Sequence, residues 1–260
     1  MSDPHILQTE HGAIVRLILN RPHSGNSLSF EMIAQLRSAL AALAERREIK
    51  VVILSGAGGR IFCAGHDLGE FALGQLAPGK GAHDFSDLAA LMQAVMAQPQ
   101  IVIAKVEGVA TAAGCELVAA CDLALASSVA RFAVPGVNIG FWCHSPQIQL
   151  SRMVGRKAAM MMLATGKLFP AAHALLIGLI NEVHAPEALD AAVDALAAEI
   201  ASKSGAILAL GKRSLQHQVV LNLADAYQFA GEAANANLQH PDAQEGIAAF
   251  LQKRPPNWVG

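Results

Sequence analysis

The stretch VATAAGCELVAACD, from Val109 to Asp122, places one glutamate among alanine, valine, leucine and cysteine. It follows Ile101–Gly108, an apolar run that predicts a buried strand, and its small residues lead into a helix expected to begin near Ala113. Glu116 would lie in the first turn of that helix. A glutamate there either complements the helix dipole from the surface or serves chemistry, because burying an uncompensated carboxylate is costly.

A second strand-to-helix turn has the same form. In RIFCAGHDLGEF, from Arg60 to Phe71, a short strand runs into Cys-Ala-Gly and continues as a helix-like segment. Backbone amides at such turns are unpaired and point outward. Two of these turns facing each other predict a two-donor pocket for an oxyanion.

Strands and helices alternate around these two turns, and the end of the chain is helical. The expected strands are Ala13–Leu19, Val51–Ser55, Ile101–Gly108, Asp122–Ala126, Arg131–Val134 and a last one within Leu176–Pro186. The expected helices are Phe30–Glu45 with Ser29 as N-cap, one reaching Ala97, and then Ala188–Lys203, Ala206–Val219, Ala224–Leu238 and Ala243–Gln252. Residues Leu73–Phe85 are loop-like. The order predicts an α/β core over residues 1–200 and a helical region over 201–260.

Composition excludes several classes of partner. The 260 residues are 53% hydrophobic and carry a net charge of −2 with scattered basic residues, so no nucleic-acid partner is expected. No apolar run approaches the roughly 18 residues of a membrane-spanning helix, so no membrane partner is expected. Four cysteines without CxxC spacing are typical of a reducing compartment. With no signal-peptide pattern at the start of the sequence, the cytoplasm is the expected location.

Metal and nucleophile motifs are missing. Cys63 and His66 have C-x-x-H spacing, but no second pair follows at a zinc-like distance, so no metal site is expected. The chain also has no G-x-S-x-G nucleophile elbow, which counts against an α/β-hydrolase.

Several blocks, in order, resemble one family. NRP…NSL (Asn20–Leu28), LSGAGGRIFCAGHDL (Leu54–Leu68), GVATAAGCELVAACDLALAS (Gly108–Ser127) and RFAVPGVNIG (Arg131–Gly140) are similar to successive blocks of the enoyl-CoA hydratase/isomerase, or crotonase, superfamily, and DAQEGIAAFLQKR (Asp242–Arg254) is similar to its closing element. AGHDL, ATAAGC and PGVN look closest to the enoyl-CoA hydratase domain-containing group. The resemblance implies a spiral of ββα units and a C-terminal helical region that forms trimers or dimers of trimers.

The resemblance also implies the parts of a site for an acyl-CoA thioester. The backbone N–H groups of His66 and Ala113 would hold the thioester carbonyl and stabilise an enolate. Glu116 matches one of the two usual catalytic glutamates, whereas the position of the other, after Pro135, is Gly136. No separate cofactor is implied, because coenzyme A is part of the substrate. The matching CoA-binding positions are Ser27, Leu28, Ala64, Asp67, Leu68, Phe250 and Lys253.

Two histidines and the reaction itself stay open. His144, in FWCHSP (Phe141–Pro146), either shares acid/base work with Glu116 or lines the acyl pocket, and the imidazole of His66 is equally ambiguous. Hydration of a 2-enoyl-CoA through a stabilised enolate is the expected activity. The alternatives are another lyase, isomerase or thioester hydrolase of this superfamily, or a non-catalytic acyl-CoA-binding protein.

Overall fold

A computed structural model describes residues 4–72 and 85–260. The loop expected at 73–85 lies outside these ranges except for its last residue. In chain order the elements are β1 (Ile6–His11), β2 (Ile14–Leu19), the 3₁₀ helix η1 (Pro22–Ser24), α1 (Phe30–Ala44), β3 (Val51–Gly56), β4 (Ile61–Cys63), α2 (Leu68–Ala72), α3 (Phe85–Ala97), β5 (Ile101–Val106), β6 (Val109–Thr111), α4 (Ala113–Ala120), β7 (Leu123–Ser127), β8 (Arg131–Ala133), η2 (Pro135–Ile139), α5 (Pro146–Met153), α6 (Arg156–Thr165), β9 (Phe169–Pro170), α7 (Ala171–Leu176), β10 (Glu182–His184), η3 (Pro186–Ala188), α8 (Leu189–Ala201), α9 (Gly205–Gln218), α10 (Leu223–Leu238) and α11 (Pro241–Gln252).

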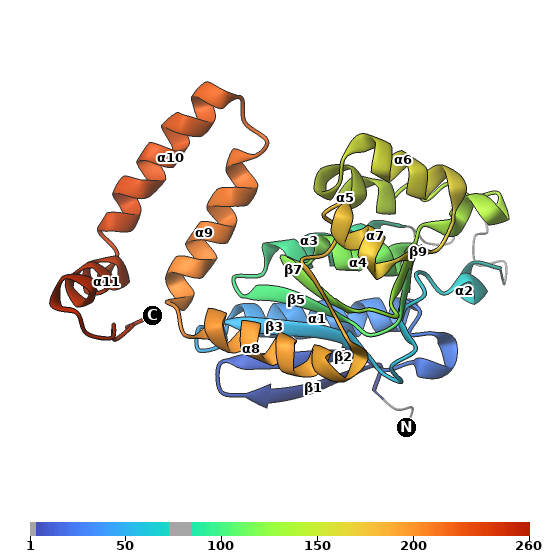
Figure 1. The fold of residues 1–260 in the computed structure, drawn as a ribbon, viewed down its shortest axis with the longest axis horizontal. Coiled ribbons are helices and arrows are strands. Elements are labelled where there is room, and N and C mark those ends of the chain that lie inside the picture. Colours follow the sequence, from blue (N-terminus) through green and yellow to red (C-terminus); the bar gives the residue numbers. More distant parts are fainter. Residues whose placement is uncertain (1–3, 73–84) are drawn as a thin grey trace.

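The strands form two sheets joined by a repeating unit. The larger sheet has the order β1-β2-β3-β5-β7-β10 and is parallel except for β1, while the smaller has the order β4-β6-β8-β9 and is parallel except for β9. Each of β3, β5 and β7 is followed by a short strand of the smaller sheet and then by a helix (Figure 1). This ββα repeat confirms the predicted α/β spiral.

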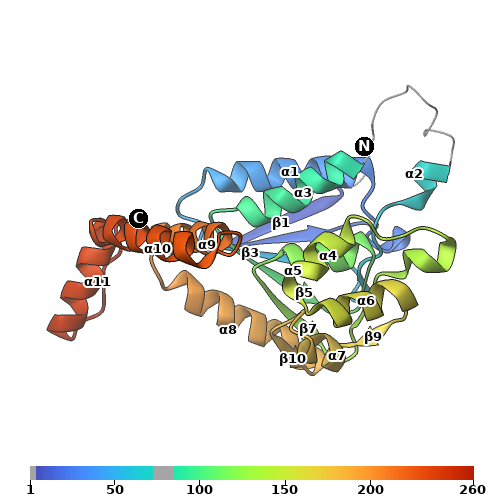
Figure 2. The ribbon, with the colours of Figure 1, turned by 90° about the horizontal axis from the view of Figure 1, so that it is seen from above.

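Helices cover both faces of the larger sheet. Figure 2 shows α1 and α3 on one side of it and α8 on the other. Strand β3 is therefore buried on both faces: Val52 and Leu54 pack in the main core, whereas Val51 and Ile53 pack against Val193 of α8. Successive side chains of a strand point to opposite faces, and each one fully buried contributes about 1.5–3 kcal/mol. The continuous apolar run VVILS follows from this two-sided cover.

The sequence patterns place most elements correctly. Helix α1 begins at Phe30, and the Ser29 hydroxyl accepts a hydrogen bond from the Met32 amide at 3.1 Å, as expected of an N-cap. The strand expected within Leu176–Pro186 is reduced to the three residues of β10, because α7 extends to Leu176 and a turn follows it. Helices α5, α6 and α7 were not anticipated.

The last three helices form an arm that extends from the core, with α11 farthest from α2 (Figure 1). Helix α9 is anchored to the core near its middle, where Lys212 donates to Asp122 at 2.6 Å and to the Gln100 carbonyl at 3.1 Å. The helical C-terminal region is thus confirmed, while the division at residue 200 stays a prediction. None of the helices within the described ranges is long and apolar enough to cross a membrane.

Candidate functional site

The two strand-to-helix turns are in direct contact. The Thr111 hydroxyl donates to the Ala64 carbonyl at 3.0 Å. Between them Gly65 has a φ of +95°, and a Cβ placed on it would lie 2.8 Å from the Ala112 Cβ. A side chain at Gly65 would therefore be strained and would push the turns apart. Glycine at this position allows the close approach that the sequence predicted.

The second turn presents the amides that open α4. Its first helical hydrogen bond runs from the Glu116 amide to the Ala112 carbonyl at 3.1 Å, so the amides from Ala113 to Cys115 precede it. A Cβ on Gly114 would lie 2.1 Å from the Cys63 carbonyl oxygen, which shows how closely α4 packs on β4. The Ala113 amide therefore lies beside the Gly65 turn at the positive end of the α4 dipole.

The first turn orients the His66 amide. Leu28 and His66 form an isolated parallel bridge, in which Leu28 donates to the Gly65 carbonyl at 2.7 Å and Asp67 donates to the Leu28 carbonyl at 3.1 Å. Because successive amides of an extended chain point in opposite directions, the His66 amide points away from Leu28. Burial lowers the pKa of His66 to about 4, so its imidazole is neutral near pH 7.

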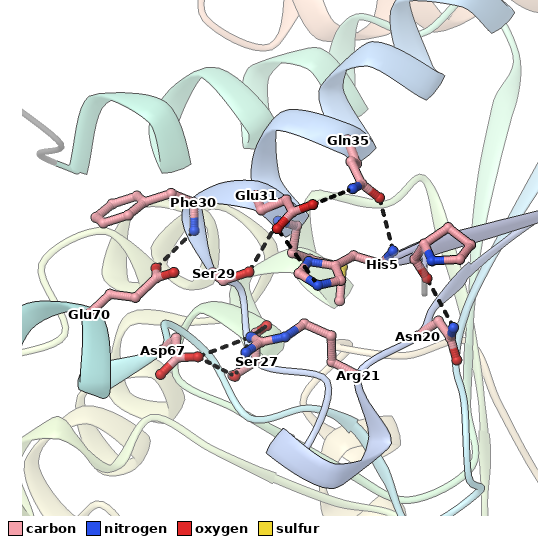
Figure 3. Close-up of polar contacts among 12 residues, drawn as sticks. His5, Asn20, Arg21, Ser27, Ser29, Phe30, Glu31, Gln35, Asp67 and Glu70 are labelled. Atoms are coloured by element: carbon pink, nitrogen blue, oxygen red, sulfur yellow. Dashed lines mark hydrogen bonds and ion pairs between the residues drawn. The ribbon is translucent and has the colours of Figure 1, made fainter. Parts of the chain in front are cut away.

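Asp67 holds this turn in place (Figure 3). Its Oδ2 accepts from Arg21 at 3.0 Å and from the Ser27 hydroxyl at 3.4 Å, and its Oδ1 accepts from the Gly69 amide at 3.1 Å. Arg21 also donates to the Ser27 carbonyl at 3.0 Å. Asp67 thus caps α2 and ties the turn to the loop before α1. Both contacts fix the backbone next to the His66 amide.

The residues matching CoA-binding positions fall into two groups. The first group surrounds the Leu28–His66 bridge and consists of Ser27, Leu28, Ala64, Asp67 and Leu68. Leu68 is 59% exposed there. Phe250 and Lys253 are also exposed, but they lie at the end of α11, on the opposite side of the molecule from α2 (Figures 1 and 2). Within one chain the structure does not bring the two groups together.

Glu116 is buried rather than turned to solvent, with 2% of its surface exposed. Its Oε1 accepts a hydrogen bond from the Ser145 hydroxyl at 2.8 Å, while its Oε2 has no hydrogen-bond partner among residues 4–72 and 85–260. Burial raises the pKa of Glu116 to about 7, and the Ser145 hydrogen bond acts in the opposite direction. The carboxyl can therefore accept and return a proton near neutral pH, as a general acid–base must.

The structure leaves no room for a side chain at Gly136, where the resemblance implies a second carboxyl. A Cβ placed on Gly136 would lie 2.3 Å from the Phe141 carbonyl oxygen and 2.9 Å from the Cys143 Sγ. The Gly136 amide donates to that sulfur at 3.3 Å, and the Phe141 amide donates to the Gly136 carbonyl at 3.0 Å. Any side chain at Gly136 would thus require the backbone at 141–143 to move.

His144 lies next to the residue that contacts Glu116, but its own side chain is at the surface, and the shared acid–base role stays a prediction. The His144 side chain is exposed and makes an edge-to-face contact with Phe141, with ring centroids 6.0 Å apart. The neighbouring Ser145 reaches the carboxyl instead, and sequence reasoning missed it. The sequence signal that could have drawn attention to Ser145 is the Ser-Pro pair, which is typical of a helix start and predicts an N-cap. In the structure the Ser145 hydroxyl caps no helix amide.

The buried thiols and the arrangement of possible metal ligands limit the reactions that the site can support. Burial raises the pKa of Cys63 and of Cys115 to about 12, so neither thiol is an effective nucleophile near neutral pH. Within the described part of the chain no cluster of three or more His, Cys, Asp or Glu side chains is arranged to hold a metal ion. The groups that remain for chemistry are the backbone amides of His66 and Ala113 and the Glu116 carboxyl, whose pKa is about 7.

Comparisons with known proteins show the family and the fold of the chain. Residues 9–260 match the family described as Enoyl-CoA hydratase/isomerase. The mitochondrial enoyl-CoA hydratase domain-containing protein 3 of Xenopus laevis is 43% identical over 256 residues, which is 98% of this chain and 85% of that protein. A crotonyl-CoA hydratase of Syntrophomonas wolfei is 30% identical over 100% of this chain and 99% of its own. The crystal structure of human enoyl-CoA hydratase domain-containing protein 3 superposes with a TM-score of 0.94 at 39% identity, covering 98% and 100% of the two chains.

The same comparisons overturn the cytoplasmic location expected from the sequence. The relatives from Xenopus laevis and Homo sapiens, at 43% and 41% identity, are named as mitochondrial proteins. All four cysteines are buried and free. Thiols of this kind fit any reducing compartment, so they do not single out the cytoplasm.

Proposed function

Because the chain belongs to the enoyl-CoA hydratase/isomerase family, we propose that it adds water across the double bond of a 2-enoyl-CoA. The observation that carries this proposal is the buried Glu116 carboxyl, which has one unpartnered oxygen and a pKa near 7. It lies on the helix that supplies one of the two turn amides. The crotonyl-CoA hydratase among the relatives supports the same reaction class.

The amides of His66 and Ala113 bind the thioester carbonyl oxygen in this proposal. As water adds to C3, the electrons of the double bond move toward the thioester and negative charge develops on that oxygen. Fixed backbone donors stabilise the charge without reorganising, and one such donor contributes about 2.7–4 kcal/mol to lowering the barrier. The contact between the Gly65 turn and the α4 turn supports this role.

Glu116 performs both proton transfers. Its Oε2 takes a proton from the attacking water as the bond from oxygen to C3 forms, and the protonated carboxyl then gives a proton to C2. One proton is taken and one returned, so the carboxyl ends in its starting state. A pKa near 7 suits both steps, because neither the acid nor the base form is strongly favoured.

Coenzyme A is bound, in the same proposal, by residues of two copies of the chain. Ser27, Leu28, Ala64, Asp67 and Leu68 line one part of the path, and Phe250 and Lys253 come from a neighbouring copy in a trimer or a dimer of trimers. The length of the arm supports this arrangement (Figure 1). So do its exposed apolar side chains, which include Leu215, Val219, Val220, Leu223, Tyr227 and Phe250.

A double-bond isomerase is the second candidate. The closed position at Gly136 favours it, since one carboxyl suffices to move a proton between two carbons of an enoyl chain and no water needs to be held. The same pair of amides would stabilise the intermediate enolate.

Turnover of crotonyl-CoA and of longer 2-enoyl-CoAs tests the proposal through the loss of absorbance of the conjugated thioester. We expect Glu116→Gln to lower kcat by about 10²–10⁴-fold, and the exposed Glu199→Gln to leave it unchanged. No turnover by the wild-type protein, with acyl-CoA binding intact, rejects hydration. Conversion of a 3-enoyl-CoA under the same conditions would then identify the isomerase.

A further inference from the structure

Ser145 occupies a helix N-cap without capping the helix. It precedes Pro146 at the start of α5, where a serine hydroxyl ordinarily accepts a hydrogen bond from an amide of the first turn. Here no such bond forms, and the hydroxyl donates to Oε1 of Glu116 at 2.8 Å. A hydroxyl group that normally stabilises a helix end is thus directed at the carboxyl.

The turn that carries Ser145 depends on Gly136. Within this turn the Gly136 amide donates to Cys143 at 3.3 Å and the Phe141 amide donates back to Gly136 at 3.0 Å. A Trp142–Gln147 side-chain hydrogen bond of 2.8 Å fixes the other end. Because a Cβ at Gly136 would lie 2.3 Å from the Phe141 carbonyl oxygen, this path of the chain requires glycine.

Besides this hydroxyl, two thiols lie near the carboxyl of Glu116. Cys115 on its own helix and Cys143 on the facing turn are close enough to interact electrostatically with it, and burial raises the pKa of both thiols. Ser145 is the one hydrogen-bond donor to the carboxyl found in the described ranges. Its bond occupies Oε1 and leaves Oε2 for proton exchange.

We propose that Ser145 is a positioning residue that holds the Glu116 carboxyl with Oε2 directed to the substrate, and that Gly136 is required because it forms the turn presenting Ser145. The inference rests on the proposed acid–base role of Glu116. It goes beyond that role by assigning the residue that orients the carboxyl and the glycine on which the turn of that residue depends. In this chain the hydroxyl of Ser145, not a second carboxyl, contacts Glu116.

Titration of Glu116 in the absence of substrate tests the contact independently of activity. The carboxyl is followed by ¹³C NMR of protein labelled at the glutamate Cδ, and Glu116→Gln identifies its resonance. We expect Ser145→Ala to move the titration midpoint to higher pH, because a hydrogen bond to the ionised form is lost. Ser145→Thr should restore the wild-type midpoint, and Ser151→Ala, an exposed serine of the same helix, should leave it unchanged.

Steady-state kinetics separate positioning from folding. We expect Ser145→Ala to lower kcat about tenfold with KM within about twofold, and Ser145→Thr to recover most of kcat. A folded Ser145→Ala variant with the wild-type midpoint and kcat overturns the proposal. Should Ser145→Ala not fold, Ser145→Cys, a weaker donor of similar size, replaces it under the same criteria.

The two proposals fail in different ways. If the wild-type protein does not turn over enoyl-CoA but the midpoint still rises in Ser145→Ala, hydration is rejected and the positioning contact stands. Gly136→Glu tests the turn: we expect lower thermal stability and loss of turnover. A stable Gly136→Glu variant with turnover above wild type overturns the requirement for glycine.

Discussion

At the scale of single residues, the ionisation of Glu116 is coupled to the stability of the fold. The ordinary pKa of this carboxyl is 4.5, and burial raises it to about 7 in the folded chain. The folded state therefore binds the proton more tightly than the unfolded state. The associated stability is fully present below pH 4.5 and is lost as the pH rises through 7.

Glu116→Gln removes this dependence. At pH 8 we expect the variant to be more stable than wild type by roughly 3 kcal/mol, because a neutral amide replaces a buried carboxylate, and at pH 4 we expect the difference to vanish. Urea unfolding at pH 4, 6 and 8 measures the free energy of unfolding of both proteins. Glu199→Gln, at an exposed site, serves as control and should follow wild type. Equal stability of Glu116→Gln and wild type at pH 8 would contradict the burial argument.

Single residues also show which parts of the site can be predicted from the sequence. Glu116 was found because a carboxylate inside an apolar run stands out. Ser145 was not found, because its role depends on the turn at Gly136, and nothing in FWCHSP shows which way a hydroxyl points. His144 attracted attention for its chemistry, yet its side chain lies at the surface.

At the scale of elements, the attachment of α9 to the core depends on a buried ion pair. Lys212 of α9 is 7% exposed and donates to Asp122 at 2.6 Å, while Asp122 also accepts from the Val102 amide at 2.8 Å. The pair thus joins α9 to β5 and to the residue before β7. Removing one member leaves an uncompensated charge in the interior, which is costly.

We expect Lys212→Met to lower the free energy of unfolding by about 3–5 kcal/mol. Adding Asp122→Asn should restore part of the loss, because the orphaned charge disappears while the Val102 amide keeps an acceptor. Urea unfolding of wild type, the two single variants and the double variant gives the coupling free energy between Lys212 and Asp122. Additive effects of the two substitutions would show that the ion pair contributes nothing beyond its separate parts.

Elements differ in how clearly the sequence specifies them. Strands β2, β3 and β5 and the last four helices were predicted because apolar runs and helical periodicity continue over many residues. Strand β1, whose six side chains are mostly exposed, was not predicted. Strands β4, β6 and β10 have three residues each, and β6 was not anticipated. Helix α5 was missed because its buried positions, Pro146, Gln149 and Leu150, have helical spacing but include a proline and a glutamine, so they give no apolar pattern. Short elements take their conformation from the neighbours they pair with, and periodicity does not record those neighbours.

At the scale of the whole molecule, the arm exposes more apolar surface than a monomer needs. Leu223 and Tyr227 of α10 are each 74% exposed. In sedimentation equilibrium we expect a mass of three or six chains. Leu223→Asp with Tyr227→Asp should yield monomers, because burying the new charges is unfavourable. The control Thr9→Asp, on exposed β1, should leave the mass unchanged, and a monomeric wild-type protein would refute the shared site.

The turn closed by Gly136 has an evolutionary consequence. Every other amino acid would place its Cβ 2.3 Å from the Phe141 carbonyl oxygen, so a single codon change cannot introduce an acid there without remodelling the segment through Ser145. An acid at position 136 would therefore need accompanying substitutions between Phe141 and Ser145, which no single mutation supplies.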